Sequence, residues 1–391
     1  MASTVDTSVK FALSSMTGAP VISGQAGSRI SAIKAFAVTG WGVKTVDAGG
    51  TISAGKCRLP FSSGASAAIV NSVILVSGAT PGGLNGEQKI TAVSSTWVEF
   101  ATALPDGAVT GSVTFKMAPL GWEEVFTKTN VSVFRPTDLQ SSRPYIRIDD
   151  SNATYAIVQM YESMTDVDTG INGTPARYWL GRSSASANAV SWTGAGDSRG
   201  MYIGVAPYAT SATDFTYGQS VWYVGDIISD RKPDAYPAML MSNGSTSMSQ
   251  DGVLFYGVVS NSYLMRIAAG IGVASTTTVQ SMISGGNVVS GGDSSWGAFP
   301  SRAAQALFVV PILVGDGGTL AGTGRRGQMP GARYCPQSGV QPTYGSVPAQ
   351  IPGTDELLGK TLLTVAVGSS MSSAANGLGF IDVTGPWRLT A

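Results

Sequence analysis

Short runs of β-branched and aromatic residues, separated by glycine-rich turns, recur along almost the whole sequence. One example is SVILVSGATPGGLNGEQKITAV at 72–93, which has the pattern of a strand, a turn and a second strand. The chain contains 50 glycines. Helical spacing of apolar residues is nearly absent. The sequence therefore predicts an all-β, multi-domain fold of the β-sandwich or barrel type.

The strand and turn signals divide the chain into three parts. Residues 51–117 close on themselves and predict a small inserted β-barrel-like domain of about five strands. Residues 1–50 are expected to form an N-terminal segment that packs with the main domain, with one or two short strands at 30–46. Residues 118–391 are expected to form the main β-rich domain or domains, with short helical turns near 302–307 and 355–358.

The charge pattern excludes several classes of partner. Only 12% of the residues are charged, and 24 basic residues balance 24 acidic ones without a basic stripe, so we expect no nucleic-acid partner. The longest apolar run, at 306–314, is too short to span a bilayer, and the first residues lack the pattern of a signal peptide, so we expect no membrane partner. Low charge also indicates a surface that meets other protein, which predicts a homo-oligomer.

The chain lacks the residues that most enzymes and metal sites use. It has no histidine, which excludes a Ser-His-Asp triad and every histidine-based metal site. Its two cysteines, Cys57 and Cys335, are expected to be thiols and not a disulfide. We therefore expect no enzymatic activity, no catalytic residue, no cofactor and no metal.

Three motifs resemble ligand-binding loops but lack a required part. Asp166 and Asp168 resemble the start of a calcium loop, but Arg177 stands where the final glutamate is required. These two aspartates are expected to form a polar turn that needs no metal. The glycine-rich stretches 322–327 and 353–361 resemble nucleotide-binding loops but are not followed by a helix pattern.

Two other functions remain open on the residues alone. A carboxylate-driven hydrolase would need paired acids, and a carbohydrate-binding module would need aromatic rings on which sugars stack. The candidate acids are Glu123 with Glu124, Asp149 with Asp150, and Glu162 with Asp166; the candidate aromatics are Trp179, Tyr202, Tyr217, Trp222 and Tyr223.

Several segments resemble a family of uncharacterised structural proteins of tailed bacteriophages. Members of that family show the patterns GW…FTGTNKAVYR, LRVDD and YE.M.D.DTG, and the insertion at 72–93 is similar to a small β-module found in many such proteins. TKTN at 127–130 departs from the usual TGTN and leaves that turn's conformation open. The segments are PLGWEEVFTKTNVSVFRP, RPYIRIDDSN, YAIVQMYESMTDVDTG, VGDIIS, GRRGQMPGARY and FIDVTGPWR.

The resemblance implies a structural component of a phage virion. It favours a tail or baseplate position and a role in protein–protein assembly, with copies of itself and other virion proteins as partners. Such a protein is assembled in the bacterial host cytoplasm and resides in the virion. The alternative is a receptor- or carbohydrate-binding fibre or decoration protein of the virion. As interface anchors we expect exposed aromatics, Trp222, Tyr223 and Trp387, with Arg388, whose place beside Trp387 predicts a docked C-terminal segment.

Overall fold

The computed structural model describes residues 3–230 and 348–388, apart from 369, 370 and 376. Between these ranges it describes 238–241, 246, 255, 259–265, 276–282, 309–316, 325–335 and 340. The described residues form several antiparallel sheets and one short α-helix, without a closed barrel, which confirms the all-β class. No helix among them is long and apolar enough to cross a membrane.

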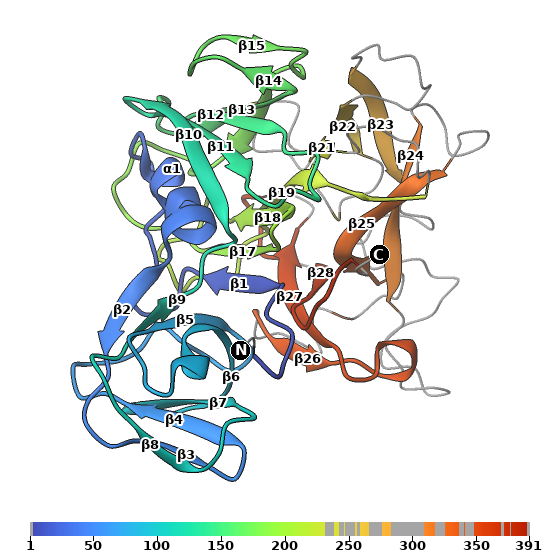
Figure 1. Cartoon of the computed structure of the whole chain (residues 1–391). Helices are drawn as coiled ribbons and strands as arrows, with labels where there is room; N and C mark the ends of the chain where they lie inside the picture. Colours follow the sequence, from blue (N-terminus) through green and yellow to red (C-terminus); the bar gives the residue numbers. More distant parts are fainter. Residues whose placement is uncertain are drawn as a thin grey trace.

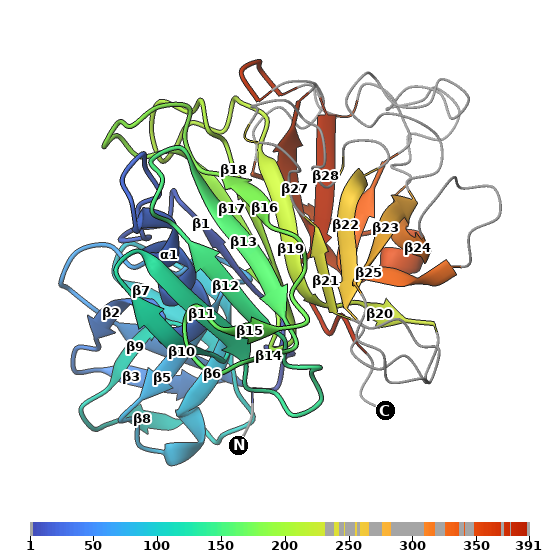
Figure 2. The ribbon, with the colours of Figure 1, turned by 90° about the horizontal axis from the view of Figure 1, so that it is seen from above.

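The largest sheet runs through most of the second half of the chain (Figures 1 and 2). It curls so that distant strands meet: Gln219 N donates to Ala366 O at 2.9 Å, and the Tyr202 hydroxyl donates to Pro330 O at 2.7 Å. Its strands, in spatial order, are β1 (Lys10–Leu13), β17 (Trp192–Gly196), β18 (Gly200–Val205), β19 (Ser220–Asp226), β21 (Ala238–Met241), β22 (Val259–Met265), β23 (Thr276–Met282), β24 (Val310–Asp316), β25 (Arg325–Tyr334), β28 (Gly377–Asp382), β27 (Thr361–Val367) and β26 (Gln350–Pro352), with β20 (Ile228–Ser229) beside β25.

A second sheet occupies the inserted block, at the lower end of the molecule in Figure 1. The expected five strands were too few, because strands such as β3 (Gly50–Ser53) and β8 (Gly107–Val109) are only four and three residues long. An isolated bridge between Thr80 and Thr110 brings the end of β8 back toward β5, so this sheet curls without closing. Its order is β2 (Trp41–Thr45), β9 (Thr114–Met117), β5 (Val73–Ser77), β6 (Gly86–Val93), β7 (Trp97–Ala101), β4 (Lys56–Pro60), β3 (Gly50–Ser53) and β8 (Gly107–Val109), with the 3₁₀ turn η2 at Gly82–Leu84.

A third sheet of five strands packs against the largest one, and a two-stranded arm projects from it (Figure 1). Contact between the two layers includes the rings of Trp179 and Trp222, whose centroids lie 4.9 Å apart. The sheet consists of β10 (Trp122–Lys128), β11 (Val131–Pro136), β12 (Tyr145–Asp149), β13 (Tyr155–Tyr161) and β16 (Arg177–Leu180); the arm consists of β14 (Ser163–Met164) and β15 (Gly170–Ile171).

The expectation of strands at 30–46 is wrong in its first half. Helix α1 (Ser28–Ile33) continues into the π-helix η1 (Lys34–Thr39), and the only strand there is β2. The buried residues Ile30, Ile33 and Phe36 recur every three positions, which places them on one helical face. The helix is too short, and too rich in β-branched residues, for that spacing to stand out in the sequence.

The remaining expectations about local structure concern two helical turns and two glycine-rich motifs, and one of the turns lies outside the described residues. The helical turn expected near 355–358 is confirmed by the 3₁₀ helix η4 (Asp355–Leu357), whereas the turn near 302–307 lies outside the described residues. The second half of the 322–327 motif begins strand β25, and the 353–361 motif leads into strand β27. Neither motif therefore precedes the helix that a nucleotide loop requires.

The inserted block is joined to the rest of the chain by strands and by a few polar contacts. Trp41 of β2 lies opposite Met117 of β9 at the point where the chain enters and leaves the block. Buried Lys89 donates to the carbonyls of Val383 and Thr384 at 3.0 and 2.7 Å. The division at 51–117 stays a prediction, and the pairing adds β2 to the folding unit.

We predict that a fragment spanning 41–117 folds alone, because its strands pair only with one another. Its amide NMR spectrum should be well dispersed. A matched fragment, 51–117, lacks β2 and leaves β9 without one of its two partners, so it should unfold at a lower temperature. A poorly dispersed spectrum for 41–117 would show that the block depends on the rest of the chain.

Candidate functional site

A fully buried ion pair fastens helix α1 to the turn after strand β12. Arg29 Nε donates to Asp150 Oδ1 at 2.5 Å, and both side chains are 0% exposed. The other carboxylate oxygen of Asp150 accepts from the backbone amides of Arg29 and Ile30 at 2.8 and 3.3 Å, so it caps the first turn of the helix. The Arg29 guanidinium also donates to the carbonyls of Asn152 and Ala153. Asp150 is the last residue of the RIDD motif, and its position in the structure is architectural.

Burial and pairing act in opposite directions on these two groups. Burial lowers the pKa of Arg29, and the negative charge of Asp150 opposes this shift. Burial raises the pKa of Asp150, and Arg29 and the helix amides oppose it. Because neither side chain reaches the surface, the pair holds the structure together and cannot contact a substrate.

A second buried network docks the C-terminal segment onto the largest sheet. The Arg388 guanidinium donates to the Asp197 carboxylate, the Tyr223 hydroxyl and the Asp226 carbonyl. The Asp226 carboxylate in turn accepts from Arg199 Nε at 3.0 Å. These contacts confirm the expected docking of the C-terminal segment, and they bring the VGDIIS and GPWR motifs together.

Trp387 packs in the same region against Gly331, a position where any side chain would clash with the indole. Its indole Nε1 donates to Asp382 O at 2.6 Å, and its ring lies edge-on to Tyr202 at 5.6 Å between centroids. Gly331 has a φ of 65°, and a Cβ added there would lie 2.1 Å from Trp387 Nε1. The PGARY segment therefore requires glycine because the tryptophan of GPWR lies directly against it.

The expectation that Trp222, Tyr223 and Trp387 are exposed is wrong. Their exposed fractions are 1%, 0% and 8%. All of β19 is buried, because the third sheet covers one face and the curled sheet covers the other, so the sequence shows no alternation there. These aromatics stabilise the core of the chain, and Arg388 is held within it. Because these side chains are buried within the chain, they are not available on its surface to anchor an interface with another protein.

The first two acid pairs do not assemble into a hydrolytic site. Glu123 and Glu124 are consecutive in β10 and so point to opposite faces. Glu123 binds Arg135 at 2.6 Å, while Glu124 binds Lys34 at 2.5 Å. Asp149 lies 3.6 Å from Arg147 on the more exposed face of β12, whereas Asp150 is buried with Arg29.

The third acid pair belongs to the polar turn in the β14–β15 arm. Asp166 accepts from the amides of Asp168 and Thr169 at 2.8 and 2.9 Å, while Glu162 accepts from Asn172 at 2.9 Å. Asp168 binds Lys128 at 2.6 Å, and these hydrogen bonds lower the pKa of both aspartates. The expected polar turn is confirmed. Its independence from metal stays a prediction, and no group of three metal-ligating side chains occurs in the described part of the chain.

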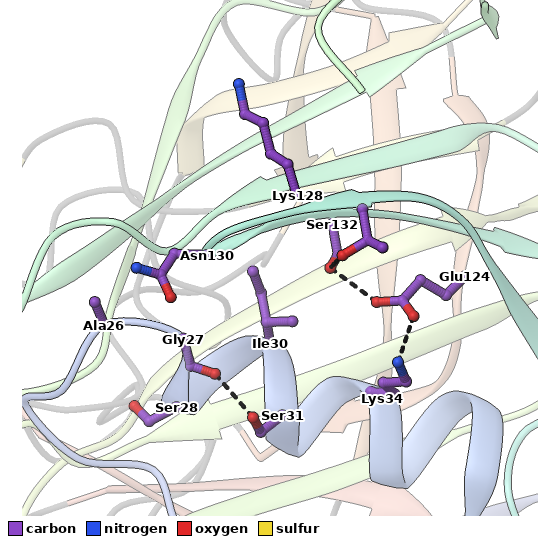
Figure 3. Close-up of a pocket in the computed structure, with 11 residues that line it drawn as sticks. Ala26, Gly27, Ser28, Ile30, Ser31, Lys34, Glu124, Lys128, Asn130 and Ser132 are labelled. Atoms are coloured by element: carbon purple, nitrogen blue, oxygen red, sulfur yellow. Dashed lines mark hydrogen bonds and ion pairs between the residues drawn. The ribbon is translucent and has the colours of Figure 1, made fainter. Parts of the chain in front are cut away.

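A polar groove of about 480 Å³ lies between helix α1 and the β10–β11 hairpin (Figure 3). Glu124 stands at its side, paired with Lys34 and accepting from Ser132 at 2.8 Å, and Lys128 points away from it. The sequence gives no sign of this groove, because one of its walls is helix α1, which the sequence does not predict. Its carboxylate and its two lysines are each engaged, Glu124 with Lys34 and Ser132, and Lys128 with Asp168 of the β14–β15 arm, so the groove offers no free acid–base pair among the described residues.

The turn of the TKTN segment at the rim of this groove adopts an ordinary conformation. Lys128 is the last residue of β10, where no positive φ is needed. Asn130 has a φ of 56°, a left-handed conformation that asparagine tolerates. The lysine in place of the family's glycine is therefore compatible with the hairpin.

No protein-family model matches this sequence, and no curated protein is significantly similar to it.

The cysteines agree with the sequence expectation, since Cys57 and Cys335 are both buried thiols. Burial raises the pKa of Cys57 to about 12, which keeps it protonated and unreactive at neutral pH.

We predict that Arg29→Met lowers the free energy of unfolding by about 3–5 kcal/mol, because it leaves the Asp150 carboxylate buried without its cation. The control is Lys34→Met, which breaks an ion pair whose lysine side chain is 46% exposed and should cost at most about 1 kcal/mol. Urea denaturation of both variants measures the difference. Equal losses would contradict the assignment.

We predict a pH dependence from Lys89, whose pKa is lowered by burial to about 8 although Asp6 and Asp382 oppose the shift. Between this value and the ordinary 10.5, the unfolded chain binds more protons than the folded chain, so stability rises with pH. Relative to Lys89→Met, the native protein should gain up to about 3 kcal/mol between pH 8 and 10.5.

Urea denaturation at several pH values in this range measures the Lys89 effect. Lys116→Met is the control for the loss of a lysine elsewhere on the inserted block. A constant difference between the native protein and Lys89→Met across the range would contradict the prediction.

Proposed function

We propose that this chain is a structural component of a tailed-bacteriophage virion, in the tail or baseplate, that acts through protein–protein assembly. One observation carries the proposal: the motifs that resemble the phage family place their distinctive residues at buried junctions. Asp150 binds helix α1, Asp226 binds Arg199, and Gly331 lies against Trp387. The first and third contacts join segments that are far apart in the sequence, and the second closes the end of the β18–β19 strand pair, as motifs that preserve architecture would do.

The exposed apolar side chains that could anchor assembly are not the aromatics expected from the sequence. Large apolar side chains are exposed at Leu139, Leu358 and Val43, with exposed fractions of 85%, 82% and 67%. Val43 lies on β2, an edge strand of the inserted sheet. These side chains replace the buried aromatics as anchors in the proposal. Homo-oligomers normally close by symmetry, so we propose a closed ring or a trimer of this chain, in contact with other virion proteins.

The alternative of a carbohydrate-binding fibre protein loses most of the rings first considered for it. Trp179, Tyr202, Trp222 and Tyr223 are each at most 1% exposed, so sugars cannot reach them. Tyr217 is only partly exposed, because its side chain packs against the hydrophobic core. Assembly is therefore the function that the described residues support better.

The proposal is tested by locating the chain in particles of the phage that encodes it. Gold-labelled antibody against the purified protein should mark one fixed position on the tail or baseplate in electron micrographs. In a reconstruction of the particle, each copy should bury well over about 800 Å² against its neighbours, the size below which contacts are incidental.

Two controls make this test decisive. Pre-incubation of the antibody with free protein should abolish the labelling. Particles without label, with the protein found only in the unassembled fraction of the lysate, would overturn the structural role.

A further inference from the structure

Trp97 differs from every other tryptophan in the described residues, because the others are all buried. It begins strand β7 of the inserted sheet, opposite Pro60 of β4. The guanidinium of Arg58, from the next outward position of β4, lies 4.1 Å from the centre of its ring. A partly exposed indole beside an arginine guanidinium provides an apolar ring surface next to a positive charge, and ligand-binding sites use both.

Alternation along β4 and β7 separates a core face from an outer face. Cys57, Leu59, Val98 and Phe100 are fully buried and point inward. The intervening positions point outward and surround Trp97 with charged and hydroxyl groups. We call this surface the Trp97 face; it comprises Thr51, Lys56, Arg58, Thr91, Trp97 and Glu99.

Charges on the Trp97 face are arranged so that the positive ones meet solvent. The Glu99 side chain is 7% exposed and lies 2.8 Å from Arg58 and 3.4 Å from Lys56. The Arg58 and Lys56 side chains are 51% and 61% exposed. The buried carboxylate therefore holds two cations in place while the outer surface stays positive, which suits an anionic ligand.

The Trp97 face is also well placed to receive an extended ligand. Strands β3, β4, β7 and β8 lie at the end of the inserted block farthest from the largest sheet (Figure 1). Thr51 stands opposite Arg58 on β3, and the Thr91 hydroxyl donates to Glu99 O at 3.1 Å on the other side. The face thus continues across four neighbouring strands, β6, β7, β4 and β3, as a polar surface with one aromatic ring.

We propose that the Trp97 face binds an acidic polysaccharide of the uronic-acid type. Nε and Nη2 of Arg58 already donate to Glu99, at 3.3 and 2.8 Å, and its guanidinium lies over one face of the indole. The aliphatic C–H face of a sugar ring therefore packs on the other face of the indole, and the sugar carboxylate pairs with Nη1 of Arg58 and with Lys56. Threonine hydroxyls on both sides match the hydroxyl groups of neighbouring sugars. This site goes beyond the assembly role and does not depend on it, and it uses a partly exposed ring that is not among the buried aromatics considered above for sugar binding.

The test uses the full chain and isothermal titration calorimetry with two probes of equal length, an oligogalacturonate and a neutral malto-oligosaccharide. The oligogalacturonate should bind, and the neutral glucan should bind at least ten-fold more weakly. Trp97→Ala and Arg58→Ser should each weaken oligogalacturonate binding at least ten-fold. Trp97→Phe keeps an aromatic ring and should retain most of it.

The control variant Lys34→Ala removes one positive charge at the groove beside α1, away from the Trp97 face, and should bind as the native protein does. Equal loss in Lys34→Ala and Arg58→Ser would reveal unspecific attraction to charge and overturn the site. Absence of binding at millimolar oligogalacturonate, or equal binding of the neutral glucan, would also overturn it. If Trp97→Ala fails to fold, the oligogalacturonate affinities of Arg58→Ser and Trp97→Phe provide the test. Particle labelling is a separate measurement, so either proposal can fail without the other.

Discussion

The buried ion pair between Arg29 and Asp150 connects three parts of the structure. It links helix α1, the turn after β12 and, through the helix, the strand that leads into the inserted block. Removing two charges from water is costly, and the pair offsets this cost only because the helix amides and two carbonyls complete its hydrogen bonds. Such a pair tolerates few other arrangements, so it selects one way of packing the helix on the sheets.

The Arg388 network uses the same principle at the opposite end of the described chain. Its partners come from β19 and from the turn between β17 and β18, while Trp387 packs against Gly331 of β25. The motifs that resemble the phage family are therefore explained by contacts within the chain. A sequence signature of this kind reports on how the chain folds, and the assembly role proposed above would depend directly on the shape of the folded chain.

Much of the fold could be predicted, and the failures have physical causes. Strands such as Tyr155–Tyr161 alternate clearly because one face is half exposed. Strand β19 is buried on both faces, so Trp222 and Tyr223 gave no sign of their direction. Helix α1 was missed because its buried spacing is shorter than the runs from which a helix is recognised. The Trp97 face was missed because only strand register and burial distinguish one tryptophan from another.

Strand β1 has a consequence for the order in which the chain folds. It is fully buried, and its sheet partner is β17, so Phe11 cannot find Ala195 until most of the first half of the chain has been synthesised. The strands of the inserted block between them pair only within 41–117, so all of its partners are available earlier than Ala195, and contacts at smaller sequence separation form faster than distant ones. In a nascent chain the inserted block could therefore be folded while the apolar strand β1 is still unpaired and exposed. Exposed apolar segments of this kind are prone to aggregate, so protection by a chaperone would matter most during that interval.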